Sequence, residues 1–114
     1  MKEMVIDGIK YVPETATELK GMKYCIVRTY SAGVFAGYVE SRNGREVVIR
    51  DVRRIYYWSG ANSLSQLAME GTAKPEECKF AMLVDKIEAL ETIEIIECTK
   101  KAQDNIEGVA EWKI

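Results

Sequence analysis

Residues 53–67 hold the densest group of side chains that could bind a ligand in this 114-residue chain. Arg53 and Arg54 are followed by the aromatic run Tyr56-Tyr57-Trp58, and small polar residues then lead to a predicted helix start at Ser63. Arginine binds phosphate through a planar fork of N–H donors, and an aromatic ring offers a face on which a base can stack. A helix N-terminus adds free backbone N–H groups. The combination predicts a site for an anionic nucleotide.

Within this segment the predicted ligand contacts fall into three chemical groups. They are Arg53 and Arg54 for phosphate, Tyr57 and Trp58 for base stacking, and Ser59, Asn62 and Ser63 for polar contacts at the helix start. Alternate residues of a strand share a face, so Arg54, Tyr56 and Trp58 are expected on one side. The alternative interpretation is a half-buried sheet face whose arginines extend to solvent.

A second candidate segment, residues 28–38, interleaves small residues with aromatic ones. Gly33 and Gly37 carry no side chain that would keep a ligand from the backbone. The predicted contacts here are Arg28 for phosphate, with Tyr30, Ser31, Gly33 and Phe35 around it. The alternative is a tight, bulged hairpin in which the glycines serve only the bend.

Three further residues are candidates at isolated positions. Thr99 and Lys100 open a second predicted helix, where a hydroxyl, a cation and the helix start could hold a phosphate. Such lysines are more commonly only solvated. Phe80 lies in a predicted strand and is either a core residue or a stacking ring. The glutamates of residues 88–97 are interpreted as surface charges, because a catalytic pair needs a pocket.

The composition excludes several kinds of chemistry. The chain has no histidine, which rules out Ser-His and Cys-His relays. Cys25, Cys78 and Cys98 lie far apart without a CxxC pair, so we expect reduced thiols, no metal site and no cofactor. A net charge of −2 and a pI near 5.3 argue against non-specific nucleic-acid binding.

The elements that must position these residues follow from local patterns. Asn43-Gly44 is a strong hairpin-turn signal, and Asp51 is expected to interrupt the strand that follows it. Ser63 with Gln66 forms a capping box for a first helix that ends at Gly71, and Thr99 caps a second helix through residue 106. The pattern predicts strands over residues 23–30, 34–40, 46–50, 52–58, 78–84, 86–90 and 93–98, and a short hairpin over residues 4–12.

These elements predict one domain over residues 1–114. The order is mostly β with two short helices late in the chain, which predicts an α+β fold with a small antiparallel sheet or open barrel. We expect no membrane span and no signal peptide. The tail Val109-Ala110-Glu111-Trp112-Lys113-Ile114 is apolar enough that it should pack against the core or a second subunit.

Several segments resemble a family of small phage-encoded proteins, the first-described Thoeris anti-defence family. The resemblance covers nearly the whole chain from residue 23 and leaves the first 22 residues outside it. It is carried by residues 28–37, 43–47, 53–68, 78–80 and 93–102. These are family-like segments and not a catalytic signature.

The resemblance implies a non-enzymatic sponge. Members of the family are oligomers that bind a cyclic ADP-ribose isomer made by bacterial TIR-domain enzymes after infection, and they hold it unaltered so that the downstream effector stays silent. Some members also bind cyclic oligonucleotides at separate pockets. The resemblance therefore implies a viral homo-oligomer, a dimer or higher such as a hexamer, acting in the cytoplasm of the infected host.

Two other functions remain open at this point. The same rings could form a single-stranded nucleic-acid-binding surface, although the acidic balance counts against it. Alternatively, the rings could form a subunit interface in a structural or protein-interaction module. An enzyme that cleaves the signal is the least favoured interpretation, because only a cysteine or carboxylate route is left to it. Neither membrane nor DNA is an expected partner.

Overall fold

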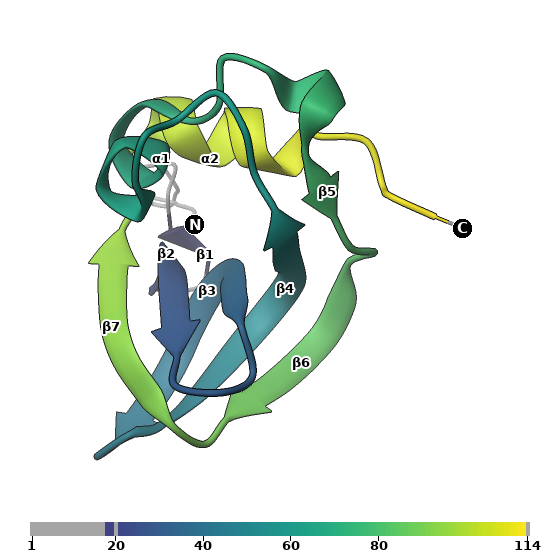
Figure 1. Cartoon of the computed structure of the whole chain (residues 1–114). Coiled ribbons are helices and arrows are strands. Elements are labelled where there is room, and N and C mark those ends of the chain that lie inside the picture. Colours follow the sequence, from purple (N-terminus) through teal and green to yellow (C-terminus); the bar gives the residue numbers. More distant parts are fainter. Residues whose placement is uncertain (1–17, 20, 114) are drawn as a thin grey trace, which may run out of the picture.

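The computed structural model describes residues 18–19 and 21–113, and the predicted hairpin over residues 4–12 lies outside this part (Figure 1). The strands are β1 (Glu18–Leu19), β2 (Met22–Thr29), β3 (Val34–Asn43), β4 (Glu46–Tyr57), β5 (Lys79–Phe80), β6 (Val84–Ala89) and β7 (Thr92–Glu97). The helices are α1 (Leu64–Glu70) and α2 (Lys100–Glu107), and a 3₁₀ turn covers Pro75–Glu77. Neither described α-helix is long and apolar enough to cross a membrane.

The strands form one antiparallel sheet around the meander β2-β3-β4. β7 pairs with β2, and β6 pairs with β4. The two-residue strands β1 and β5 also pair with β2 and β4, respectively. β6 and β7 therefore lie on opposite edges, yet only a short turn joins them, so the sheet must curl (Figure 1). No ladder between β6 and β7 is present in the described chain. The predicted α+β fold with an antiparallel sheet is confirmed.

Both faces of the central strands are buried, each in its own core. In β2, Tyr24 and Ile26 face the core that the helices cover, whereas Cys25 and Val27 face a second core on the other side of the sheet. The first core is closed by α1 and α2, which lie together at one end of the sheet (Figure 1). An α1 of seven residues could not persist alone and depends on this packing.

The β3–β4 hairpin forms as predicted, but its turn lies one residue further along. Asn43 pairs with Glu46, so the two-residue loop is Gly44-Arg45 and not Asn43-Gly44. Gly44 has a φ of +63°, at the first loop position, where a type II′ turn requires glycine.

Asp51 does not interrupt the strand as predicted. β4 runs unbroken over 12 residues, and Asp51, with a φ of +45°, forms a bulge within it. Ala36 pairs with Arg53 and Tyr38 with Arg50, so Asp51 and Val52 together face the single residue between them on β3. The bulge keeps the strand paired while it increases its curvature.

The predicted strand over residues 78–84 is divided. β5 ends at Phe80, residues 81–83 leave the sheet, and β6 begins at Val84. The reason lies in the partner strand: β4 pairs with β5 near its end at Ile55 and Tyr57, and with β6 from Val52 back to Val47.

Both predicted helix caps are present. The backbone N–H of Gln66 donates to the Ser63 hydroxyl at 3.2 Å, and that of Ala102 donates to the Thr99 hydroxyl at 3.1 Å. The capping box differs in one bond, because the Gln66 side chain accepts from the N–H of Asn62 at 2.7 Å and not from that of Ser63.

Candidate functional site

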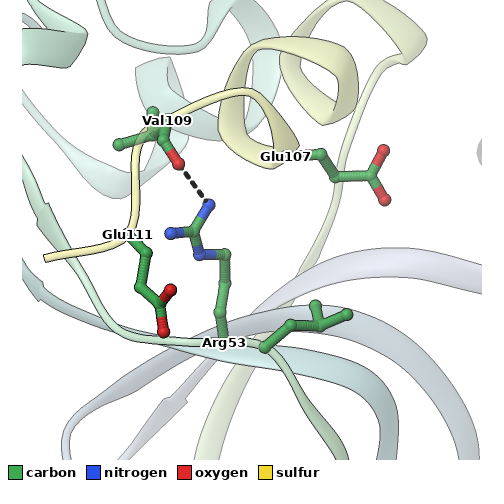
Figure 2. A pocket seen from close by; sticks show the side chains of 5 residues that line it. Arg53, Glu107, Val109 and Glu111 are labelled. Carbon is green, nitrogen blue, oxygen red and sulfur yellow. Dashed lines mark hydrogen bonds between the residues drawn. The ribbon is translucent and has the colours of Figure 1, made fainter.

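Arg53 is a structural residue, which corrects its predicted role as a phosphate ligand. Its side chain is buried, with the residue 5% exposed. Nε donates to the carbonyl of Ala81 at 3.0 Å, Nη1 donates to those of Ile106 and Val109 at 3.0 and 2.8 Å, and Nη2 donates to that of Phe80 at 3.3 Å. Figure 2 shows the guanidinium directed at Val109. Arg53 therefore ties the end of α2 to β5, and burial lowers its pKa.

The hollow beside Arg53 is unsuited to a phosphate. It has a volume of about 340 Å³ and is lined by Arg53, Leu83, Glu107, Val109 and Glu111. The carboxylates of Glu107 and Glu111 lie on either side of the guanidinium (Figure 2). Two acidic side chains at one opening repel an anion, and most donors of the arginine are already engaged.

Two of the predicted ring contacts lie in the cores, and a third packs against one of them. Phe80 is fully buried at 0% exposure, and Phe35 is buried in the second core. Trp58 is half-buried against the helix-covered core. Phe80 and Phe35 therefore present no face to a ligand, and their predicted roles as ligand contacts are corrected; the alternation of β3 and β5 turns both rings inward.

Exposed rings instead meet where β4, β5 and the tail run side by side. Tyr56 and Trp112, which are 66% and 39% exposed, stack with their ring centroids 5.3 Å apart and their planes inclined by 9°. Lys79 Nζ lies 5.2 Å from the centroid of the Trp112 ring, and Lys79 pairs across the sheet with Tyr57, which is also exposed. We call Tyr56, Tyr57, Lys79 and Trp112 the aromatic platform.

The backbone holds the platform in place. The N–H of Trp112 donates to the carbonyl of Phe80 at 2.9 Å, and Glu111 forms a parallel bridge with Phe80. The same Phe80 carbonyl accepts from Arg53. The buried arginine thus supports the strand pairing that presents Trp112 to Tyr56.

Arg54 precedes Tyr56 by two residues on β4 and is exposed. Its Cζ atom lies 4.8 Å from the centroid of the Phe35 ring, an arrangement in which the ring face attracts the cation. Within residues 21–113, no carboxylate lies at ion-pair distance from Arg54 or Lys79. Lys79 therefore lies beside an exposed ring, Trp112, whereas the ring under Arg54 is the buried Phe35. Both cations are exposed, on β5 and β4.

The polar residues before α1 are engaged within the fold. The Ser59 hydroxyl donates to Glu77 Oε1 at 3.1 Å, and the Ser63 hydroxyl donates to Asn62 Oδ1 at 2.9 Å while it caps the helix. These bonds fix the entry to α1. The predicted ligand contacts of Ser59, Asn62 and Ser63 would have to replace them.

The β2–β3 loop favours the alternative interpretation of residues 28–38, a tight hairpin in which the glycines serve the bend. Arg28 Nε donates to Glu94 Oε1 at 2.9 Å, and the Ser31 hydroxyl donates to Glu91 Oε1 at 2.7 Å. Gly33 has a φ of +101°, which serves the turn itself. Tyr30 is 79% exposed and lies in this loop, and it is not one of the platform residues. Carboxylates already occupy the polar groups of this loop.

Thr99 and Lys100 at the start of α2 are likewise engaged. The Thr99 hydroxyl donates to the carbonyl of Met69 at 2.7 Å, which joins α1 to α2, and Lys100 pairs with Asp104 at 2.8 Å. Their predicted role in phosphate binding remains a prediction.

Of the predicted ligand contacts, Arg54 and Tyr57 are exposed on β4 near the stacked rings in sequence, whereas sequence reasoning missed Tyr56, Lys79 and Trp112. The alternation of Arg54 with Tyr56 was a usable signal. No sequence signal predicted the position of Trp112, because that position depends on pairing between residues far apart in the chain.

Comparison with known proteins gives one result. Residues 22–106 match a family model described as a domain of unknown function (DUF6948). No curated protein and no solved structure matches the chain.

Proposed function

The chain belongs to the family described as a domain of unknown function (DUF6948), and we propose that it is a binding protein that sequesters an anionic nucleotide signal without altering it. The resemblance to the Thoeris anti-defence family favours a cyclic ADP-ribose isomer as the ligand, with cyclic oligonucleotides as further ligands. In this proposal the protein acts in the cytoplasm of a phage-infected bacterium and silences the effector by lowering the free signal.

The aromatic platform is the observation that carries the proposal. A base stacked on an exposed ring gains about 1–3 kcal/mol. Tyr56 and Trp112 form an exposed stack, and Tyr57 is exposed opposite Lys79. Arg54 and Lys79 add two cations for the phosphates, without a competing carboxylate at ion-pair distance among the described residues.

Binding without catalysis agrees with the chemistry of the chain. It has no histidine to act as general acid or base. Burial raises the pKa of the Cys25 thiol to about 11 and that of Cys98 to about 12, so both are protonated at neutral pH and poor nucleophiles. Cys78 is buried and its thiol lies among backbone carbonyls.

Tight sequestration needs more enclosure than one open platform offers. A nanomolar dissociation constant corresponds to about −12 kcal/mol. Met82 and Leu83, which follow β5, are also exposed. We therefore propose that a second subunit covers this surface, so that the ligand is buried between copies of the chain.

Calorimetric titration with cyclic ADP-ribose isomers tests the function directly. We expect saturable binding, and mass spectrometry of the ligand released by heat denaturation should recover the unaltered mass. A linear ADP-ribose product would identify an enzyme, and the absence of heat with every cyclic nucleotide would favour an interaction module.

A single-stranded nucleic-acid-binding function is the second candidate, because exposed rings on a curled sheet also suit stacked bases. Titration with oligonucleotides at two salt concentrations separates the two. Binding through a strand backbone weakens steeply as salt rises, whereas the proposal predicts that the cyclic nucleotide binds far more tightly than any oligonucleotide of equal charge.

A further inference from the structure

We propose a second ligand site, independent of the aromatic platform, that binds a phosphate group of a small molecule at the β3–β4 hairpin. The hairpin turn Gly44-Arg45 opens β4, whereas the platform is built on its last residues. β4 is 12 residues long, and at about 3.3 Å per residue its two ends lie at most roughly 36 Å apart, with the two sites at opposite ends. One ligand of nucleotide size could not span both.

The site is a hollow of about 400 Å³ between the hairpin and the start of β7. Arg42, Gly44 and Arg45 form its hairpin side, and residues 92–95 form its β7 side. A neighbouring hollow of about 450 Å³ shares Arg42 and Ile95 and adds the apolar side chain of Val39. The two hollows together offer a cationic margin next to an apolar floor, and a volume typical of small-molecule sites.

The charge of this region favours an anion. Glu94 and Glu97, which also line the hollows, are paired with Arg28 at 2.9 Å and with Lys23 at 3.6 Å. No carboxylate in residues 21–113 lies at ion-pair distance from Arg42 or Arg45. Two guanidinium groups therefore remain at the hollow after these acidic side chains are matched.

A buried hydroxyl provides the second, independent observation. Thr92 lines the hollow and is 8% exposed, and its Oγ1 has no hydrogen-bond partner in the described structure. Its backbone N–H donates to the carbonyl of Arg45 at 3.0 Å, which fixes β7 against the hairpin. A buried hydroxyl without a partner is unfavourable. The Oγ1 atom itself is covered, so a rotation of the Thr92 side chain about χ1 is needed to turn its proton toward a phosphate oxygen in the hollow.

These groups select the chemistry of the ligand. Guanidinium forks match the oxygens of a phosphate, and the hydroxyl supplies one further donor. The apolar floor at Val39 and Ile95 suits the remainder of a small organic molecule. The small number of cations at the hollow favours a small ligand over a nucleic-acid strand, whose binding needs many phosphate contacts.

The test is a titration of the isotope-labelled full chain with inorganic phosphate at constant ionic strength. The amide chemical shifts in NMR spectra are measured at each phosphate concentration. We expect saturable shifts at Gly44, Arg45 and Thr92, with chloride at equal ionic strength producing none. The double variant Arg42→Gln/Arg45→Gln should weaken binding about tenfold or more, as the loss of charged hydrogen bonds predicts. Shifts that never saturate, or equal binding by the double variant, would overturn the proposal.

Two further variants make the result specific. Thr92→Val keeps the shape of the side chain and should weaken phosphate binding several-fold through loss of the hydroxyl alone. Tyr56→Ala should leave phosphate binding unchanged, because the platform lies at the other end of β4. If Tyr56→Ala lost phosphate binding, the hairpin hollow and the aromatic platform would be a single site and the proposal of a second site would be wrong. This conclusion does not depend on whether the cyclic nucleotide binds.

Discussion

Gly37 on β3 faces Val52 on β4 so closely that a Cβ atom at position 37 would lie 2.8 Å from the Cβ of Val52 and 2.9 Å from the carbonyl oxygen of Arg50. The contact exists because the bulge at Asp51 brings two residues of β4 opposite one residue of β3. Glycine is required here by space and not by backbone angle.

Replacing Gly37 by alanine should therefore destabilise the fold. The added methyl group meets backbone and a β-branched side chain, so we expect a loss of about 1–3 kcal/mol in the free energy of unfolding, typical of overpacking. Urea denaturation measures it, and an unchanged midpoint would contradict the contact. As a control on the same bulge, Asp51→Gly should stabilise slightly, because glycine adopts a positive φ without strain.

The neighbours Arg53 and Arg54 should respond to substitution in opposite ways. Arg53→Gln removes donors from four backbone carbonyls and should lower stability by about 3 kcal/mol or more. Arg54→Gln changes an exposed side chain and should leave stability within about 0.5 kcal/mol, while it weakens cyclic-nucleotide binding by about 1.5–3 kcal/mol. Denaturation and calorimetry on both variants give the comparison. An Arg54 variant as unstable as the Arg53 variant would show that both arginines are structural.

The platform rings should contribute separately to ligand affinity. We expect Trp112→Ala and Tyr56→Ala each to weaken cyclic-nucleotide binding by about 1–3 kcal/mol, the usual contribution of a stacked base. Tyr30→Ala is the matched control, because Tyr30 is an even more exposed ring that lies in the β2–β3 loop, away from the platform. If Tyr30→Ala were the most damaging of the three, the site would lie at that loop instead.

Stability should fall in alkaline solution. The thiols of Cys25 and Cys98 ionise near 9.0 in an unfolded chain, but burial raises their pKa to about 11 and about 12 in the fold. The folded state therefore retains protons that the unfolded state releases, and stability is lost as the pH rises from 9.0 through these values. Burial and Glu107 raise the pKa of Tyr24 and Tyr38 in the same direction.

Denaturation midpoints on either side of pH 9.0 measure this effect. Cys98→Ala should flatten the decline even though the variant starts from lower stability, because one ionising group is gone. A decline as steep in the variant as in the parent chain would show that the Cys98 thiol does not contribute.

Local signals predicted most of the elements, and long-range contacts explain most of the differences. The caps at Ser63 and Thr99 act within a few residues of themselves and formed as predicted. Strand alternation also placed Arg53 and Arg54 on opposite faces correctly, but it could not predict which face is exposed to solvent. Both faces of the central strands are buried, so alternation there carries no polarity.

The candidate site was less predictable than the fold. Tyr57 and Arg54 come from one strand, and their chemistry was legible in the sequence. Trp112 reaches Tyr56 only through backbone pairing of the tail with Phe80. The local sequence pattern carries no signal for this pairing. The sequence therefore predicted only that the tail packs against the core or a second subunit.

The placement of β6 and β7 on opposite edges also sets the order in which the chain can fold. β2, β3 and β4 connect through short hairpins, whereas β7 must find β2 from far along the chain; Arg28 and Glu94, which join them, are 66 residues apart. Closing that long loop is entropically slow, so the three-strand meander should assemble first and β7 dock afterwards. Amide hydrogens of β7 should then be the first of the sheet to exchange with solvent.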